Sequence, residues 1–180
     1  MKKLLLIAFA LCLLVSCASI GPNSEGSKFM AGVEDTGSDS GLWEKYYYLD
    51  EFLSPTDKAY ITVPIVGAFS DSLAEGSLLT GYLVVEEDLV KIELYEYDIY
   101  PAAAETGSVY VKMKAGDEVV DVGSAVQKDY TFVLYDAKAV FDLFTRYDEV
   151  QFYVETTSKY YFSVSTAGFV HAYKTAFASK

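Results

Sequence analysis

The chain has 180 residues, of which 26 are acidic and 14 basic, so its formal net charge is −12 at pH 7. This balance excludes non-specific nucleic-acid binding as a main activity, because contact with phosphates requires a basic surface. Only two cysteines are present, which are too few for a fold held together by a disulfide framework.

The first sixteen residues have the layout of a secretory signal peptide. Lys2 and Lys3 precede an unbroken apolar run from Leu4 to Val15. A run of about twelve residues matches the apolar region of a signal peptide and is too short to cross a bilayer as a helix. We therefore expect residues 1–16 to be removed on export.

The stretch from Leu14 to Cys17 resembles the lipobox of bacterial lipoproteins. The resemblance implies that the chain is cut before Cys17, that the Cys17 thiol receives a diacylglycerol, and that the new amino group is acylated, for example with palmitate. The alternative is that Cys17 is a cysteine without a functional role. The other cysteine, Cys12, lies inside the apolar run and is expected to be discarded with it.

Lipid attachment would decide where the protein is held. Without residues 1–16 the basic count is 14 − 2 = 12, and the net charge becomes 12 − 26 = −14. A body this acidic is repelled by anionic headgroups, so the lipid and not the protein surface would hold the chain at the membrane. We expect a lipid-anchored protein of the bacterial cell envelope, in the outer membrane or at the cell surface rather than in the inner membrane.

The part after the signal peptide divides into two segments. Residues 17–41 are rich in glycine, serine and acids, which predicts a flexible tether behind the lipidated cysteine. Residues 42–180 are long enough for one domain and carry Tyr, Phe and Val in short runs between turn residues. This pattern predicts a mainly β fold, an antiparallel sandwich or barrel of about eight strands. The expected strands are residues 58–66, 81–87, 89–100, 108–115, 118–123, 130–135, 149–156 and 159–165.

Residue spacing orients several of these segments. Alternating apolar residues along 108–115 predict a half-buried strand, and those along 149–165 predict a hairpin with both apolar rows on one face. Two segments have helical spacing instead. One is 136–148, with Asp136 as its N-cap, and the other is 165–180. Both are expected to be short amphipathic helices packed against the sheet.

Two positions disturb the strand pattern. Pro64 lacks an amide hydrogen, so we expect its strand at an edge of the sheet. Glu96 continues an otherwise apolar row, and a bulge near Tyr95 would turn it away from that row.

The residues needed for common catalytic sites are missing from the sequence. His171 is the single histidine, no Gly-x-Ser-x-Gly motif occurs, and no phosphate-binding loop is found. We therefore expect no cofactor, no metal site and no catalytic residues. The alternative is a glycoside hydrolase or another envelope enzyme that uses two carboxylates, for which Glu93 and Glu96 are the candidates.

Aromatic residues supply the remaining functional hypothesis. Tyrosine and tryptophan rings beside hydrogen-bonding groups are common in surfaces that bind sugars or peptides. The other interpretation is that these rings fill the core or pair across strands. The sequence thus predicts a non-enzymatic binding or scaffolding module for an envelope protein or glycan. Its candidate contact residues are Trp43, Tyr46, Tyr47, Tyr95 and Tyr97.

Overall fold

The computed structural model describes residues 42–70, 75–102, 108–128 and 130–178. Residues 1–41, which include the expected signal peptide, Cys17 and the tether, lie outside the described residues. The strands are β1 (Glu44–Leu49), β2 (Pro55–Ser70), β3 (Glu75–Val85), β4 (Val90–Glu96), β5 (Tyr100–Pro101), β6 (Ser108–Ala115), β7 (Glu118–Lys128), β8 (Thr131–Leu134), β9 (Glu149–Glu155) and β10 (Lys159–Ser165). The helices are α1 (Ala137–Phe144) and α2 (Phe169–Phe177).

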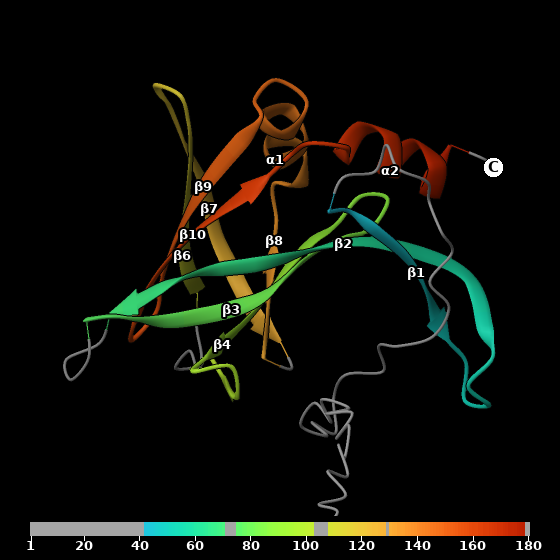
Figure 1. Cartoon of the computed structure of the whole chain (residues 1–180), viewed down its shortest axis with the longest axis horizontal. Coiled ribbons are helices and arrows are strands. Elements are labelled where there is room, and N and C mark those ends of the chain that lie inside the picture. The colour runs from blue at the N-terminus through green and yellow to red at the C-terminus, as the bar shows by residue number, and fades with distance from the viewer. Residues whose placement is uncertain (1–41, 71–74, 103–107, 129, 179–180) are drawn as a thin grey trace, which may run out of the picture.

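All ten strands belong to one antiparallel sheet. Their order is β1-β2-β10-β9-β6-β7-β8-β4-β3, and the short β5 pairs with β4. β3 also pairs with β2, so the sheet curls back on itself (Figure 1). The predicted mainly β, antiparallel fold with two short helices is therefore confirmed.

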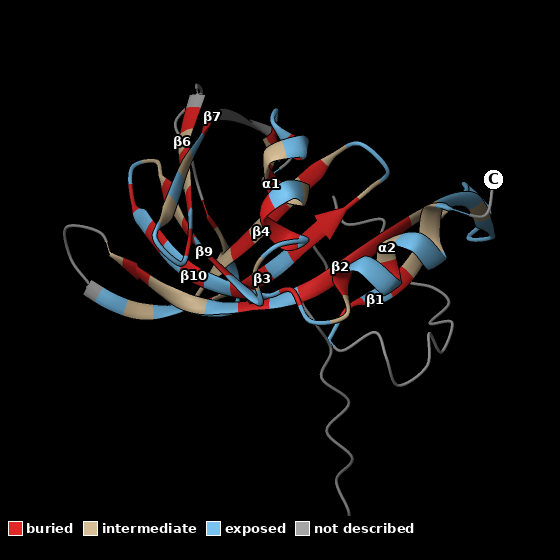
Figure 2. Cartoon of the chain, turned by 90° about the horizontal axis from the view of Figure 1, so that it is seen from above, coloured by how far each residue is buried: buried red, intermediate tan, exposed pale blue. Residues whose placement is uncertain are grey.

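The core fills the inside of the curled sheet. Buried and exposed residues alternate along several strands, as the period of two in a half-buried strand requires (Figure 2). The predicted hairpin of β9 and β10 is confirmed by direct pairing of Phe152 with Phe162. Their rings stack with centroids 4.9 Å apart and face the interior. Burying such aromatic pairs is a main source of the free energy that holds the strands together.

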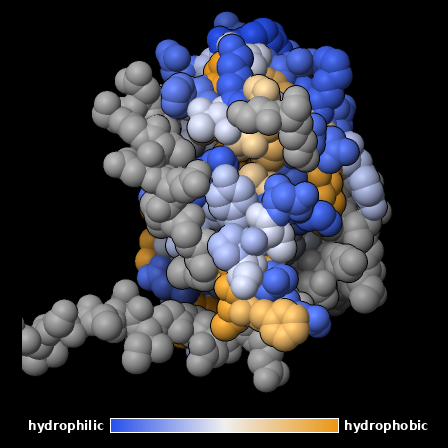
Figure 3. Space-filling model, turned by 90° about the vertical axis from the view of Figure 1, so that its right-hand side faces the viewer, coloured by the Kyte–Doolittle hydropathy of each residue, from blue (hydrophilic) through white to orange (hydrophobic). Residues whose placement is uncertain are grey.

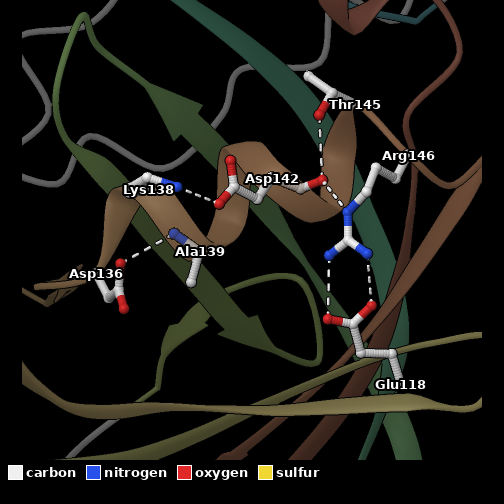
Figure 4. Close-up of polar contacts among 7 residues, drawn as sticks. All are labelled: Glu118, Asp136, Lys138, Ala139, Asp142, Thr145 and Arg146. Carbon is white, nitrogen blue, oxygen red and sulfur yellow. Dashed lines mark hydrogen bonds and ion pairs between the residues drawn. The ribbon is translucent and has the colours of Figure 1, made fainter.

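The two helices cover different parts of the sheet. α1 packs on β7 and β9, and α2 packs on β1 and β2. As predicted, Asp136 caps α1, because its side chain accepts a hydrogen bond from the Ala139 amide at 2.9 Å (Figure 4). Arg146, just after α1, donates two hydrogen bonds of 2.8 and 3.0 Å to the carboxylate of Glu118 in β7. The helices have 8 and 9 residues, so neither of them could cross a bilayer.

Pro64 does not mark an edge strand, contrary to the expectation. β2 pairs with β3 along one side, where Pro64 lies opposite Tyr82. Along its other side, the pairing with β1 ends at Thr62 and the pairing with β10 begins at Val66. Pro64 thus lies at a gap between two neighbours, where a residue without an amide hydrogen is tolerated.

The expected bulge near Tyr95 is also absent, because the register between β3 and β4 is regular along β4. Glu96 therefore stays on the inward face. Its carboxylate accepts a hydrogen bond of 2.9 Å from the hydroxyl of the buried Tyr160. The strand then ends at a turn whose first two residues have positive φ values of 53° and 66°.

Candidate functional site

Five tyrosines and one glutamate gather on the outward face of β1 to β4. Alternate residues of these strands point into the core, which leaves the residues between them outside. The register places Tyr46 opposite Tyr60, and Tyr82 opposite Glu93. We call this set the tyrosine face, and it consists of Tyr46, Tyr48, Tyr60, Tyr82, Glu93 and Tyr95.

Tyr60 is the centre of the ring contacts in this set. Its ring stacks on that of Tyr46, with centroids 5.6 Å apart and an angle of 18° between the planes. The ring of Tyr48 lies 5.0 Å from the same ring. The Tyr46 hydroxyl donates to Glu44, and the Tyr48 hydroxyl donates to Glu86, both at 2.5 Å. These contacts hold the rings in fixed positions.

The ionisable groups of the face are strongly influenced by burial. Burial raises the pKa of Glu93, and the nearby Lys91 opposes that rise. The Lys91 ammonium forms an ion pair with Glu86 and donates to the Tyr48 hydroxyl at 3.1 Å. Lys91 is therefore shared among three groups. The negative charge of the Glu93 carboxylate is therefore only partly compensated by Lys91.

Four tyrosine hydroxyls of the face, those of Tyr46, Tyr48, Tyr60 and Tyr95, have a raised pKa and stay protonated at neutral pH. The hydrogen bond to Glu44, together with burial, raises the pKa of Tyr46 to about 12. Burial is the largest cause of the raised pKa of Tyr48, Tyr60 and Tyr95. The face thus offers flat rings, hydroxyls that donate and accept, and a carboxylate that accepts.

Two small residues lie beneath the centre of the face. Thr62 and Val84 are paired across β2 and β3, and they are only 8% and 3% exposed although they point outward. Among the buried side-chain oxygens and nitrogens of the described residues, the Thr62 hydroxyl is the one without a hydrogen-bond partner. An unpaired buried hydroxyl costs about 1–3 kcal/mol, and native proteins keep few of them.

The aromatic residues selected from the sequence do not form one site. Tyr46 and Tyr95 belong to the tyrosine face. Tyr47 points to the opposite side of β1, where the Lys45 ammonium lies 4.8 Å from its ring centre. Tyr97 lies in the turn after β4, with its ring 5.1 Å from that of Phe69.

Trp43 is part of the core and not of a binding surface. Its side chain is fully buried. The ring lies 5.8 Å from Phe144 and 5.0 Å from Phe169, and the indole nitrogen donates to the Ser165 carbonyl at 3.1 Å. The expectation that Trp43 contacts a ligand is therefore corrected. The other interpretation of the aromatic residues, that they fill the core, applies to Trp43.

The two candidate catalytic carboxylates are on opposite sides of the sheet. Glu93 faces outward opposite Tyr82, whereas Glu96 faces inward toward Tyr160. Hydrolysis of a glycosidic bond needs two carboxyl groups on either side of the same bond. Glu93 and Glu96 do not form such a pair.

Three comparisons, with models of protein families, with curated proteins and with solved structures, find no match for this chain. Within the described ranges, no group of three or more His, Cys, Asp or Glu side chains could hold a metal ion. His171 is exposed on α2. The tyrosine face is therefore the feature of the described surface that points to a function.

The raised pKa of Glu93 has a measurable consequence for stability. A carboxyl group with a higher pKa in the folded state contributes less stability as pH rises above the unfolded value of 4.5. We expect the Glu93→Gln variant to be more stable than the wild type at pH 7. This advantage should shrink as pH falls to about 4.5 and below, because Glu93 then becomes protonated in the unfolded state as well as in the folded state. Urea unfolding at both pH values measures the difference.

The matched control is Glu51→Gln, which changes an exposed carboxylate outside the tyrosine face. It should alter the unfolding free energy little at either pH. A Glu93→Gln variant that is less stable at pH 7 than the wild type would mean that the charge of Glu93 stabilises the fold.

Proposed function

We propose that this protein is a membrane-anchored lipoprotein of the bacterial cell envelope. Its domain serves as a non-enzymatic binding or scaffolding module for a protein or a glycan. The anchor is supported by the sequence from Lys2 to Cys17. The binding role is supported by one structural observation, the gathering of five tyrosines around a half-buried glutamate on a single outward face.

The chemistry of the tyrosine face suits a ligand with flat apolar surfaces and hydroxyl or amide groups. Tyr82 is 45% exposed and offers its ring directly. Tyrosine rings stack on sugar or peptide surfaces, and protonated hydroxyls complete the hydrogen bonds of such ligands. The Thr62 hydroxyl would also gain a partner if an adjacent side chain moved aside. The rings of Tyr46 and Tyr48 are already held by Glu44 and Glu86, so these two side chains lose little entropy on binding.

Binding is tested with the full chain and a variant of the face. Glycan arrays and capture from envelope extracts are compared for the wild type and for Tyr46→Ala combined with Tyr82→Ala. Loss of two contact rings, at about 1–2 kcal/mol each, should weaken binding by tenfold or more. The control variant carries Tyr130→Ala and Tyr135→Ala, which remove exposed rings elsewhere.

Binding by the control should equal binding by the wild type. Thermal unfolding of both variants establishes that they are folded. The proposal is wrong if the folded wild type captures nothing in either assay. The assignment to the tyrosine face is wrong if both variants bind as well as the wild type.

A further inference from the structure

Two large apolar side chains project from the turn between β1 and β2. Phe52 is 78% exposed and Leu53 is 76% exposed. We call residues 50–54 the β1–β2 tip. Figure 3 shows apolar atoms at the lower end of the face that carries this hairpin. Burying these two side chains against a partner would be favourable. In the single chain they stay exposed to water.

The tip is built as a rigid turn. The Asp50 carboxylate accepts hydrogen bonds from the amides of Phe52 and Ser54, at 2.8 and 2.9 Å. The Asp50 amide donates to the Ser54 carbonyl at 2.9 Å, and Leu53 adopts a left-handed φ of 61°. The apolar side chains are thus presented in a fixed geometry, so docking them costs little ordering entropy. The tip also carries two acids, Asp50 and Glu51, and no base.

A groove with complementary properties lies on the outward face at the other end of β2. Its volume is about 600 Å³. Among the described residues that line this groove there are two lysines and no acidic residue, although the chain as a whole has nearly twice as many acids as bases. We call it the lysine groove, and its side chains include Val66, Lys112, Lys114, Val119, Tyr153 and Tyr161.

Apart from the two lysines, the lining of the lysine groove is mostly apolar or aromatic. Val66 is 68% exposed and Val119 is 59% exposed, so both present most of their apolar surface to solvent. The rings of Tyr153 and Tyr161 lie 5.2 Å apart and form an aromatic wall. An apolar lining with two lysines, of which Lys112 is also attracted to Asp121 of β7, is complementary to an apolar tip with two acids.

We propose that the β1–β2 tip docks into the lysine groove of a second copy of this chain. The two features cannot meet within one molecule. The tip precedes Pro55 and the groove begins at Val66, and the strand between them is on the order of 36 Å long at about 3.3 Å per residue. That strand is paired with β1 from Pro55 to Thr62 and with β3 from Ile61 onward, so it does not fold back.

The geometry has a consequence for assembly. Each copy carries one tip and one groove, so the contact is head-to-tail and can repeat into rows of molecules. Two buried side chains give a weak contact, with a dissociation constant of about 0.1–1 mM, which crowding on a membrane would strengthen. The contact itself does not depend on the lipid, so it goes beyond the proposed function and can fail or succeed independently of it.

Site-specific crosslinking of full-length chains tests the contact. Two differently tagged copies are expressed in the same cells, one with Leu53→Cys and the other with Val119→Cys, and are treated with a short bismaleimide. We expect a crosslinked dimer that carries both tags. The control pairs Leu53→Cys with Tyr135→Cys, whose position is exposed but outside the groove. Chains without an introduced cysteine give the background from Cys12 and Cys17.

Charge reversal separates the specific contact from chance encounters. Lys112→Glu with Lys114→Glu on the Val119→Cys copy should reduce the two-tag dimer about tenfold. Glu51→Lys on the other copy should restore part of it. Circular dichroism checks that each variant is folded.

Four results would overturn the proposal. The first is a dimer yield with Tyr135→Cys equal to that with Val119→Cys. The second is a yield that the lysine substitutions leave unchanged. The third is a dominant dimer between two Leu53→Cys copies, which would show that the tips pair with each other. A Leu53→Cys chain that is protected from a water-soluble maleimide and forms no dimer would instead place the tip in lipid or in another protein, and would also contradict the proposal.

Discussion

Replacing Trp43 by alanine is expected to remove about 3–5 kcal/mol of folding stability, the range for large aromatic side chains in a core. Trp43 is fully buried and touches both helices, through Phe144 of α1 and Phe169 of α2. Its indole also donates to the Ser165 carbonyl, so β1 is tied to the end of β10. Removing the ring would leave a cavity where β1 and the two helices meet.

The loss should be measured by urea unfolding followed with far-UV circular dichroism. Trp43 is the only tryptophan, so its fluorescence cannot be compared between the wild type and the alanine variant. Leu42→Ala, which changes an exposed neighbour, is the control and should cost less than about 0.5 kcal/mol. A cost below about 1 kcal/mol for Trp43→Ala would contradict the placement of Trp43 in the core.

Replacing Gly81 by alanine is the second large expected effect, a loss of about 3 kcal/mol or more. A Cβ atom at Gly81 would lie 1.9 Å from the carbonyl oxygen of Glu93. That oxygen belongs to the backbone of β4, so the strands must separate to accept a methyl group. Gly81 thus permits the close approach of β3 and β4 that holds Glu93 in place on the tyrosine face.

Gly76→Ala is the matched control on the same strand. Among the described residues, no atom outside its chain neighbours lies within 4 Å of a Cβ placed there, and we expect its positive φ of 73° to cost about 1–2 kcal/mol. Unfolding free energies of both variants give the comparison. Equal losses at the two positions would contradict the close packing of β3 on β4.

The sequence was informative where one residue pattern sufficed to define an element. Strict alternation defined β6 and the hairpin of β9 and β10, and Asp136 marked the start of α1. β1 was missed because its Tyr46, Tyr47 and Tyr48 are consecutive, and tyrosine suits both an exposed and a half-buried position. Apolar and polar residues do not alternate clearly along this segment, so no strand was predicted there.

Strand order and close contacts were not available from the sequence. β10 pairs with β2, β6 with β9 and β4 with β8, and no local pattern specifies which strands so far apart in the chain pair. The position of Pro64 was mispredicted for the same reason. The gap beside it, between β1 and β10, is created by tertiary pairing. Glu96 was expected to leave the core face, but the buried Tyr160 hydroxyl supplies it with a partner there. Tyr60 and Tyr82 lay in expected strands, yet only the register identified them as neighbours of the other tyrosines and Glu93.

The central claim, a lipid-anchored module, is tested most directly by mass spectrometry of the N-terminus. The protein is purified from membranes of the bacterium that produces it. We predict a first peptide that begins at Cys17, carries the added mass of the diacylglycerol and acyl chains, and has no thiol that reacts with an alkylating reagent. An unmodified Cys17 thiol, or a chain cut at another residue, would contradict the claim.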